Sequence, residues 1–190
     1  MNKTNELVKK IALVGLLTAL VTVLSFIKIP VLSIATLNLV LPVVVIGAAI
    51  CGPLVGAWLT VIPALTSFGE AALFLSYNPV GTVLTLFLKG ILAGLASGFV
   101  YKLLAKKHQI GAVTCAAVVA PVVNTGIFLL GCYIFIWDAL VGLAVENSVS
   151  IGMLIFGLAG MNFIIELLLN IILCPTILRI IQIAAKKKLV

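Results

Sequence analysis

Long uninterrupted apolar runs dominate the chain, and polar residues gather in the short stretches between them. The runs are continuous rather than alternating at every second residue, which predicts helices and not the strands of a barrel. An apolar helix of about 20 residues crosses a lipid bilayer. The pattern therefore predicts an all-α, polytopic membrane protein that forms one domain over residues 1–190. Its six predicted transmembrane helices cover residues 11–27, 38–50, 54–68, 80–104, 110–136 and 151–183.

Proline and glycine mark where these helices end or bend. Gly52 and Pro53 separate the second run from the third, and the second run is short enough that we expect it to tilt or to extend into the preceding loop. Pro175 is expected to interrupt the last helix. The intervening residues 69–79 and 137–150 are predicted to be polar loops.

The first apolar run resembles a signal peptide, because Lys9 and Lys10 precede it. It is longer than the usual apolar region of such a peptide, and further spans follow it. We therefore interpret it as the first transmembrane helix.

The overall composition supports a membrane protein. The chain of 190 residues is 64% hydrophobic and 9% charged, with a mean hydropathy of +1.39. A soluble domain carries roughly 25% charged residues, so this chain cannot cover a water-exposed surface. The net charge of +7 does not indicate nucleic-acid binding, since the basic residues flank apolar runs and form no soluble basic domain.

The distribution of cations predicts the orientation. Lysines and arginines cluster in the N-terminal tail, in residues 102–107 and in the C-terminal segment. With six spans these three segments share one side, which the positive-inside rule places in the cytoplasm. Both termini of this multi-pass membrane protein are therefore predicted to be cytoplasmic.

Two ionisable residues lie near the middle of predicted spans. Lys89 is about ten residues into its helix and Glu166 about fifteen into its own. A charge at the bilayer centre costs at least ~2.5–3.5 kcal/mol on insertion scales, so each requires a structural or functional reason.

The last helix adds a polar face. Asn162, Glu166 and Asn170 are spaced four residues apart and share one side, and Asn124 lies at comparable depth in the fifth run. Two interpretations stay open. These groups form an interhelical polar clamp in which Lys89 pairs with Glu166, or they converge on a pocket for a small hydrophilic ligand.

Polar and aromatic residues near the predicted outer surface are further candidates for substrate contact. Tyr77, Asn78 and Trp137 lie in the predicted loops. An aromatic belt at the membrane interface is one explanation for the rings, and a lid over bound substrate is the other.

Small residues recur at four-residue spacing. Gly90, Gly94 and Gly98 do so in the fourth run, where close packing within the molecule is the expected role. Gly15 and Ala19 form a similar pair in the first helix, where they are available to another subunit.

Several kinds of chemistry have no support in the sequence. It contains no phosphate-binding loop, so the chain does not itself hydrolyse ATP by that mechanism, and no catalytic motif. The four cysteines have no metal-binding spacing and are interpreted as apolar packing residues. We therefore predict a protein that is not an enzyme, without catalytic residues, metal or cofactor.

Size, topology and several motifs together resemble one family. The Gly15/Ala19 pair, the turn at residues 52–56 and the segment at 89–95 followed by Tyr101 and Lys102 are similar to the S-components of energy-coupling factor (ECF) transporters. S-components are the substrate-binding membrane subunits of these importers. The resemblance covers nearly the whole chain.

The resemblance implies a mechanism and partners. S-components capture a vitamin or related micronutrient with high affinity in their outer half, beneath loops. They then associate with a transmembrane coupling protein and two cytoplasmic ATPases, and deliver the substrate by toppling in the membrane. An Ala-xxx-Ala motif on the first helix of the family contacts the coupling protein. Gly15 and Ala19 occupy its positions here, and the glycine is a departure that should still permit close approach.

The substrate stays open at this point. Lys89 would suit a carboxylate such as that of pantothenate, whereas Glu166 and the asparagines would suit a form of vitamin B6; riboflavin, folate and queuosine precursors are other candidates. Two other classes of protein are alternatives. One is a self-contained proton-coupled secondary transporter, and the other is a structural or assembly protein without a ligand.

Overall fold

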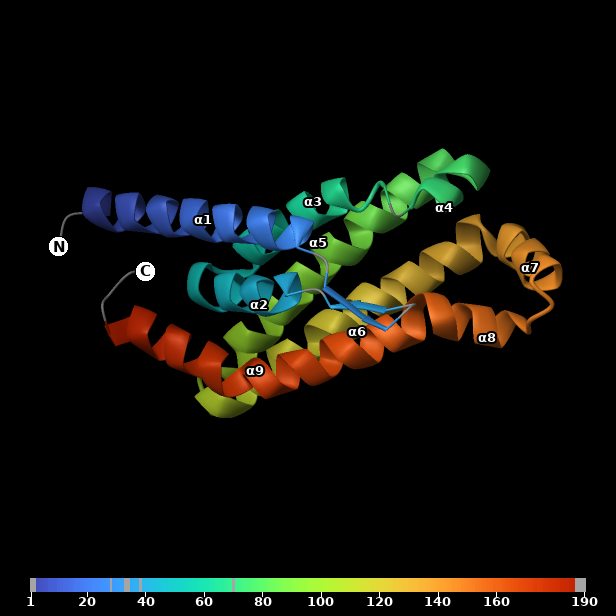
Figure 1. The fold of residues 1–190 in the computed structure, drawn as a ribbon. Coiled ribbons are helices and arrows are strands. Elements are labelled where there is room, and N and C mark those ends of the chain that lie inside the picture. Colours follow the sequence, from blue (N-terminus) through green and yellow to red (C-terminus); the bar gives the residue numbers. More distant parts are fainter. Residues whose placement is uncertain (1–2, 28, 33–34, 38, 70, 187–190) are drawn as a thin grey trace.

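The computed structural model describes residues 3–27, 29–32, 35–37, 39–69 and 71–186 as an elongated bundle of apolar helices (Figure 1). Helices form over each of the six apolar runs. They are α1 (Lys3–Phe26), α2 (Val40–Cys51), α3 (Pro53–Thr66), α5 (Pro79–Leu104), α6 (Gln109–Phe135) and α9 (Met161–Lys186).

Among the described residues, four helical segments are long and apolar enough to cross a membrane. They are Leu7–Phe26, Pro79–Leu104, Gln109–Phe135 and Ile151–Lys186. Helices α2 and α3 are apolar but shorter, at 12 and 14 residues. At 1.5 Å per residue they extend only about 18–21 Å, less than the roughly 30 Å hydrocarbon core. The chain is a polytopic, predominantly helical membrane protein.

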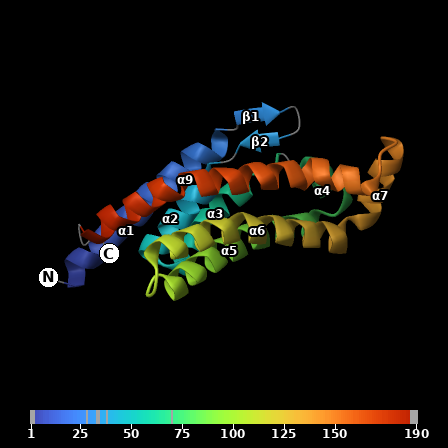
Figure 2. The ribbon, with the colours of Figure 1, turned by 90° about the horizontal axis from the view of Figure 1, so that it is seen from below.

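The two ends of the bundle differ. The start of α1, the end of α9 and the turn between α5 and α6 lie together at one end, and α4 (Ala72–Tyr77) and α7 (Trp137–Glu146) lie at the other (Figures 1 and 2). The first end carries Lys102, Lys106, Lys107 and Lys186. We call it the basic end, and the opposite one the α7 end.

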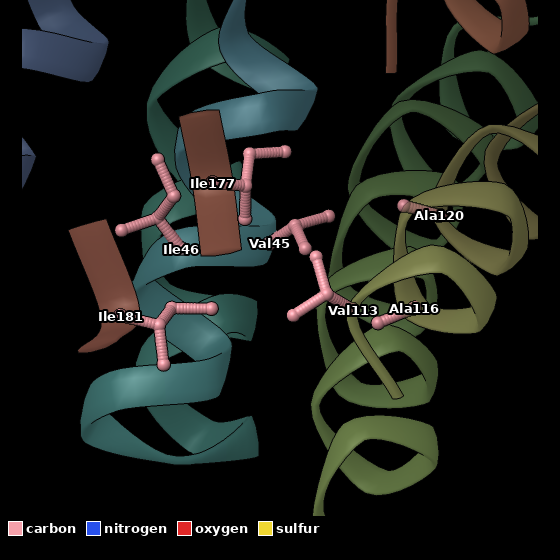
Figure 3. Close-up of a cluster of buried hydrophobic side chains, with 7 residues drawn as sticks. All are labelled: Val45, Ile46, Val113, Ala116, Ala120, Ile177 and Ile181. Atoms are coloured by element: carbon pink, nitrogen blue, oxygen red, sulfur yellow. The ribbon is translucent and has the colours of Figure 1, made fainter. Parts of the chain in front are cut away.

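The half of the bundle nearer the basic end is closely packed. Val45 and Ile46 of α2 meet alanines of α6 and Ile177 and Ile181 of α9 in a buried cluster (Figure 3). Because lipid is as apolar as these side chains, van der Waals contact rather than exclusion from water holds such helices together. This half therefore contains the main buried contact between α2, α6 and α9.

Helix α1 packs by one face only. Leu17 and Val21 are buried against α2 and against Leu59 of α3. The indole N–H of Trp58 in α3 donates a hydrogen bond to the Thr18 hydroxyl at 3.3 Å. Leu16, Leu20 and Val23 of α1 are exposed.

Helices α3 and α5 cross at backbone contact. A Cβ placed on Gly94 would collide with the carbonyl group of Gly56, and one on Gly98 would collide with Pro53. The glycine repeat of α5 therefore packs within the molecule, as predicted. Gly52, between α2 and α3, has a φ of 103°, a left-handed conformation that favours glycine and that orients Pro53 to begin α3.

The segments between the apolar runs are more ordered than predicted. β1 (Ile29–Leu32) and β2 (Ala35–Leu37) form an antiparallel hairpin in which Ile29 lies opposite Leu37. β2 contacts α9, and the hairpin lies beside α9 in Figure 2. The predicted loops 69–79 and 137–150 contain helices α4 and α7 instead.

The last helix is irregular in a place that the sequence does not indicate. α8 (Ile151–Ile155) continues through a π-helical turn, η1 (Phe156–Gly160), into α9. The predicted interruption at Pro175 is wrong, because α9 runs through this proline. Pro175 is exposed.

Candidate functional site

A cavity of about 340 Å³ lies between α4, α5, α6 and the start of the last helix, in the half of the bundle toward the α7 end. Its walls come from the first part of α5, the last part of α6 and the π-helical turn. The volume is at the small end of the usual range for small-molecule sites.

Four of the predicted residues form the inner end of this cavity, here called the floor. Lys89 of α5, Asn124 of α6 and Asn162 and Glu166 of α9 all line it. The Asn124 side chain hydrogen-bonds to the Glu166 carboxyl group, and Lys89 is close enough to attract that carboxyl electrostatically. The floor therefore offers amide groups, a cation and a carboxyl group in one place.

Aromatic rings cover the walls above the floor. The Lys89 ammonium lies over the Phe128 ring, 5.0 Å from its centroid. Phe74 of α4 meets Phe128 edge-on, with 6.2 Å between the ring centroids. Lys89 thus contacts an aromatic face, which stabilises a desolvated ammonium group. The wall between α4 and α6 is suited to an apolar part of a ligand.

The outer end of the cavity is fixed by contact between α5 and α6. A Cβ on Gly81 would collide with Phe135, and one on Gly131 would collide with Thr85. Asn78 accepts a hydrogen bond from the Gly81 N–H at 2.9 Å and donates one to the Phe135 carbonyl at 3.2 Å. Asn78 therefore caps α5 and joins it to the end of α6.

Three predicted site residues lie outside the lining. Asn78 has the capping role just described, and Tyr77 at the end of α4 is about half exposed. Trp137 packs edge-on against Tyr133 with ring centroids 5.4 Å apart, and both rings are exposed. In this conformation the structure does not bring these three residues to the cavity.

Asn170 continues the polar face of α9 but does not line the cavity. It is fully buried, and its side-chain N–H donates a hydrogen bond to the Glu166 carbonyl at 3.0 Å. One turn further along, Cys174 packs against the core cluster. The polar face therefore divides between the cavity and the packed half.

Sequence reasoning missed much of the lining. Ser67, Thr82, Thr85 and Thr125 line the cavity together with the floor residues. Threonine is common in membrane helices and carries no signal of depth or direction by itself. The four-residue spacing from Lys89 back to Thr85, and the three further residues to Thr82, would have placed both on the same side of the helix.

Gly15 and Ala19 lie on the exposed side of α1, away from the cavity. A Cβ added at Gly15 would meet no atom within 4 Å. Within the part of the chain that the structure describes, no three His, Cys, Asp or Glu side chains lie close enough to hold a metal ion.

Comparison with protein families gives a match over residues 9–178 to the ECF transporter, substrate-specific component. The chain belongs to this family. It is a membrane subunit for substrate uptake and is not itself an enzyme. A search of curated proteins and of solved structures found no match to this chain. As a substrate-specific component, the chain requires a place for substrate, and the cavity above the Lys89–Glu166 floor is the candidate.

Proposed function

We propose that this substrate-specific component captures a vitamin or related micronutrient with high affinity in the cavity between α5, α6 and α9. The observation that carries the proposal is the convergence of Lys89, Asn124, Asn162 and Glu166 at the floor of a cavity of about 340 Å³. Groups from three helices meet there, whereas a clamp between two helices would leave no space between them. The preferred ligands are pantothenate-like or vitamin B6-like molecules, which are small enough for such a volume.

The same proposal places the chain in the bacterial cell membrane as one domain over residues 1–190, with six spans and cytoplasmic termini. The basic end of the bundle supports this orientation, since cations favour the cytoplasmic side. Helix α2 is too short to cross the membrane alone. The hairpin of β1 and β2, which precedes α2 and contacts α9 through β2, would complete this crossing. Non-helical backbone is tolerated at membrane depth where protein covers it.

Transport is proposed to depend on a transmembrane coupling protein and two cytoplasmic ATPases. The family description makes the chain one component of a transporter, which argues against a self-contained secondary transporter. The exposed Gly15/Ala19 side of α1 is the proposed contact for the coupling protein. Small residues there allow the backbones of two helices to approach closely.

Protection of a native cysteine tests the location of the site. Cys132 is buried and lines the cavity, whereas Cys115 on the same helix is exposed. We expect pantothenate or pyridoxine, at about ten times its Kd, to slow modification of Cys132 by a small thiosulfonate roughly tenfold. Modification of Cys115 should be unchanged. Peptide mass spectrometry measures both rates, and equal rates at Cys132 with and without each compound would contradict this assignment of site and ligands.

A further inference from the structure

Two groups of opposite charge meet at the floor of the cavity. Among the described lining residues, Lys89 of α5 and Glu166 of α9 are the two that carry charge. The Lys89 ammonium lies over the Phe128 ring, 5.0 Å from its centroid, and the Asn124 side chain hydrogen-bonds to the Glu166 carboxyl group. Asn124 and Phe128 are four residues apart on α6, so they share one side of that helix. This side of α6 therefore holds the cation and the carboxyl group close to each other.

The closeness of these two charges affects what the floor can bind. Lys89 is close enough to the Glu166 carboxyl group to attract it electrostatically. An anion that approached Lys89 would also approach Glu166, and a cation that approached Glu166 would also approach Lys89. A charged group loses its water shell when it enters the cavity, and a balanced pair of charges offsets little of that loss. The floor therefore disfavours ligand groups with a net charge of either sign.

The amide groups of the floor are suited to an uncharged ligand group. Asn124 and Asn162 both line the cavity. A side-chain amide has two N–H donors and a carbonyl oxygen with two acceptor positions, so one partner does not use all of its hydrogen-bonding capacity. Hydroxyl, carbonyl and ring-nitrogen groups of a ligand pair with such donors and acceptors. The rings of Phe74 and Phe128 cover the adjacent wall, against which a flat ring of the ligand can lie.

We propose that Lys89 and Glu166 neutralise each other, and that the floor selects a substrate head group without net charge. This inference rests on the proposed capture function and narrows its substrate class. Asn124 and Asn162 bind hydroxyl, carbonyl or ring-nitrogen groups of the head group, and the charged pair supplies hydrogen bonds rather than a counter-ion. Of the two preferred chemistries, pyridoxine has no net charge at neutral pH and meets this requirement, whereas the carboxylate of pantothenate does not.

Two sets of matched compounds test this selection in the purified wild-type protein. Pyridoxine, pyridoxic acid and pyridoxamine share one ring and carry an alcohol, a carboxylate or an ammonium group at the same position, and panthenol is the alcohol that matches pantothenate. We expect the uncharged compound of at least one set to bind about tenfold or more tightly than its charged counterparts in isothermal titration. Tightest binding of a charged compound would overturn this inference alone. Binding by none of the compounds would contradict the capture of these ligands, and with it the inference.

Substitutions in the charged pair test whether the two groups neutralise each other. Glu166→Gln keeps a hydrogen-bonding partner for Asn124 and leaves the Lys89 charge uncompensated. We therefore expect the carboxylate compound to gain about tenfold in affinity relative to the uncharged one. Lys89→Met should shift the preference toward the ammonium compound for the corresponding reason. An unchanged order of preference in both variants would overturn the inference.

The double variant Lys89→Met/Glu166→Gln tests the same pair without a lone charge in the membrane. It should again prefer the uncharged compound, and its Tm should be closer to that of wild type than the Tm of either single variant, because the two losses are coupled. It also decides the case in which a lone charge prevents folding, since the double variant should then fold and bind. A double variant less stable than both single variants would overturn the inference.

Glu146→Gln is the matched control. Glu146 is an exposed residue at the end of α7, outside the cavity lining. We expect this variant to keep both the Tm and the order of preference among the compounds, because the carboxylate that it removes does not face the ligand. The same shift in preference in Glu146→Gln and Glu166→Gln would show a general effect of protein charge and would contradict a neutral pair at the floor.

Discussion

Asn162→Ala is expected to weaken ligand binding about tenfold or more while the protein stays folded. Asn162 lines the floor of the cavity together with Glu166 and Asn124. The side-chain amide offers both a donor and acceptors, and removing it would leave a polar group of the bound ligand unsatisfied. Such a loss costs about 1–3 kcal/mol, which corresponds to roughly 5- to 150-fold in Kd. Isothermal titration measures the affinity, and thermal unfolding in detergent measures the Tm.

Asn170→Ala is the control on the same face of α9. Asn170 is fully buried outside the cavity lining, so its truncation should lower the Tm and leave the Kd within about threefold of wild type. The interpretation of the polar face as a clamp makes the opposite prediction for Asn162. If Asn162→Ala lowered the Tm as much as Asn170→Ala and bound ligand normally, the floor would be a structural clamp and not a binding site.

The second large effect is expected at the exposed side of α1. Gly15→Leu and Ala19→Leu should abolish uptake in cells that carry the coupling protein and ATPases, and leave ligand affinity unchanged. The reason is steric, because a bulky side chain separates two helices that must approach closely. The substitutions should not disturb the fold, since both residues are exposed and a Cβ on Gly15 meets no atom within 4 Å.

Gly126→Leu is the matched control for the α1 variants. Gly126 is an exposed glycine of α6, and a Cβ placed there also meets no atom within 4 Å. We expect uptake and co-purification with the coupling protein to be normal in this variant. If Gly15→Leu retained both, or if Gly126→Leu lost both, the coupling protein would contact another surface.

The helices of this bundle were predictable because each depends on local sequence. Uninterrupted apolar runs identify α5 and α6, and the glycine repeat at Gly90, Gly94 and Gly98 identifies the face of α5 that α3 covers. The hairpin at residues 29–37 was not predictable in this way. Its strands are short, and their pairing depends on contact with α9, which is far away in the sequence.

The candidate site was predictable only in part. Charge at mid-depth and four-residue spacing indicated that Lys89, Asn162 and Glu166 face the protein interior. The same pattern included Asn170, because sequence spacing does not show where a cavity ends and packed helices begin. Thr82 and Thr85 of the lining were missed, because a threonine in an apolar helix gives no signal of the direction that it faces.

The directions of the Tyr77 and Trp137 rings could not be predicted from the sequence either. Their ring type and position near the predicted outer surface are compatible with both a lid and an interfacial belt. The direction of each ring depends on tertiary neighbours such as Tyr133, which packs against Trp137. Composition and spacing contain no information about these contacts.

The most direct test of the central claim is mass spectrometry of small molecules released by denaturing the purified wild-type protein, with an unrelated membrane protein as control. The account predicts one micronutrient at close to one molecule per chain from cells grown in vitamin-rich medium, and much less in Asn162→Ala. No compound above the control level, or equal amounts in wild type and Asn162→Ala, would contradict capture of a substrate at the floor of this cavity.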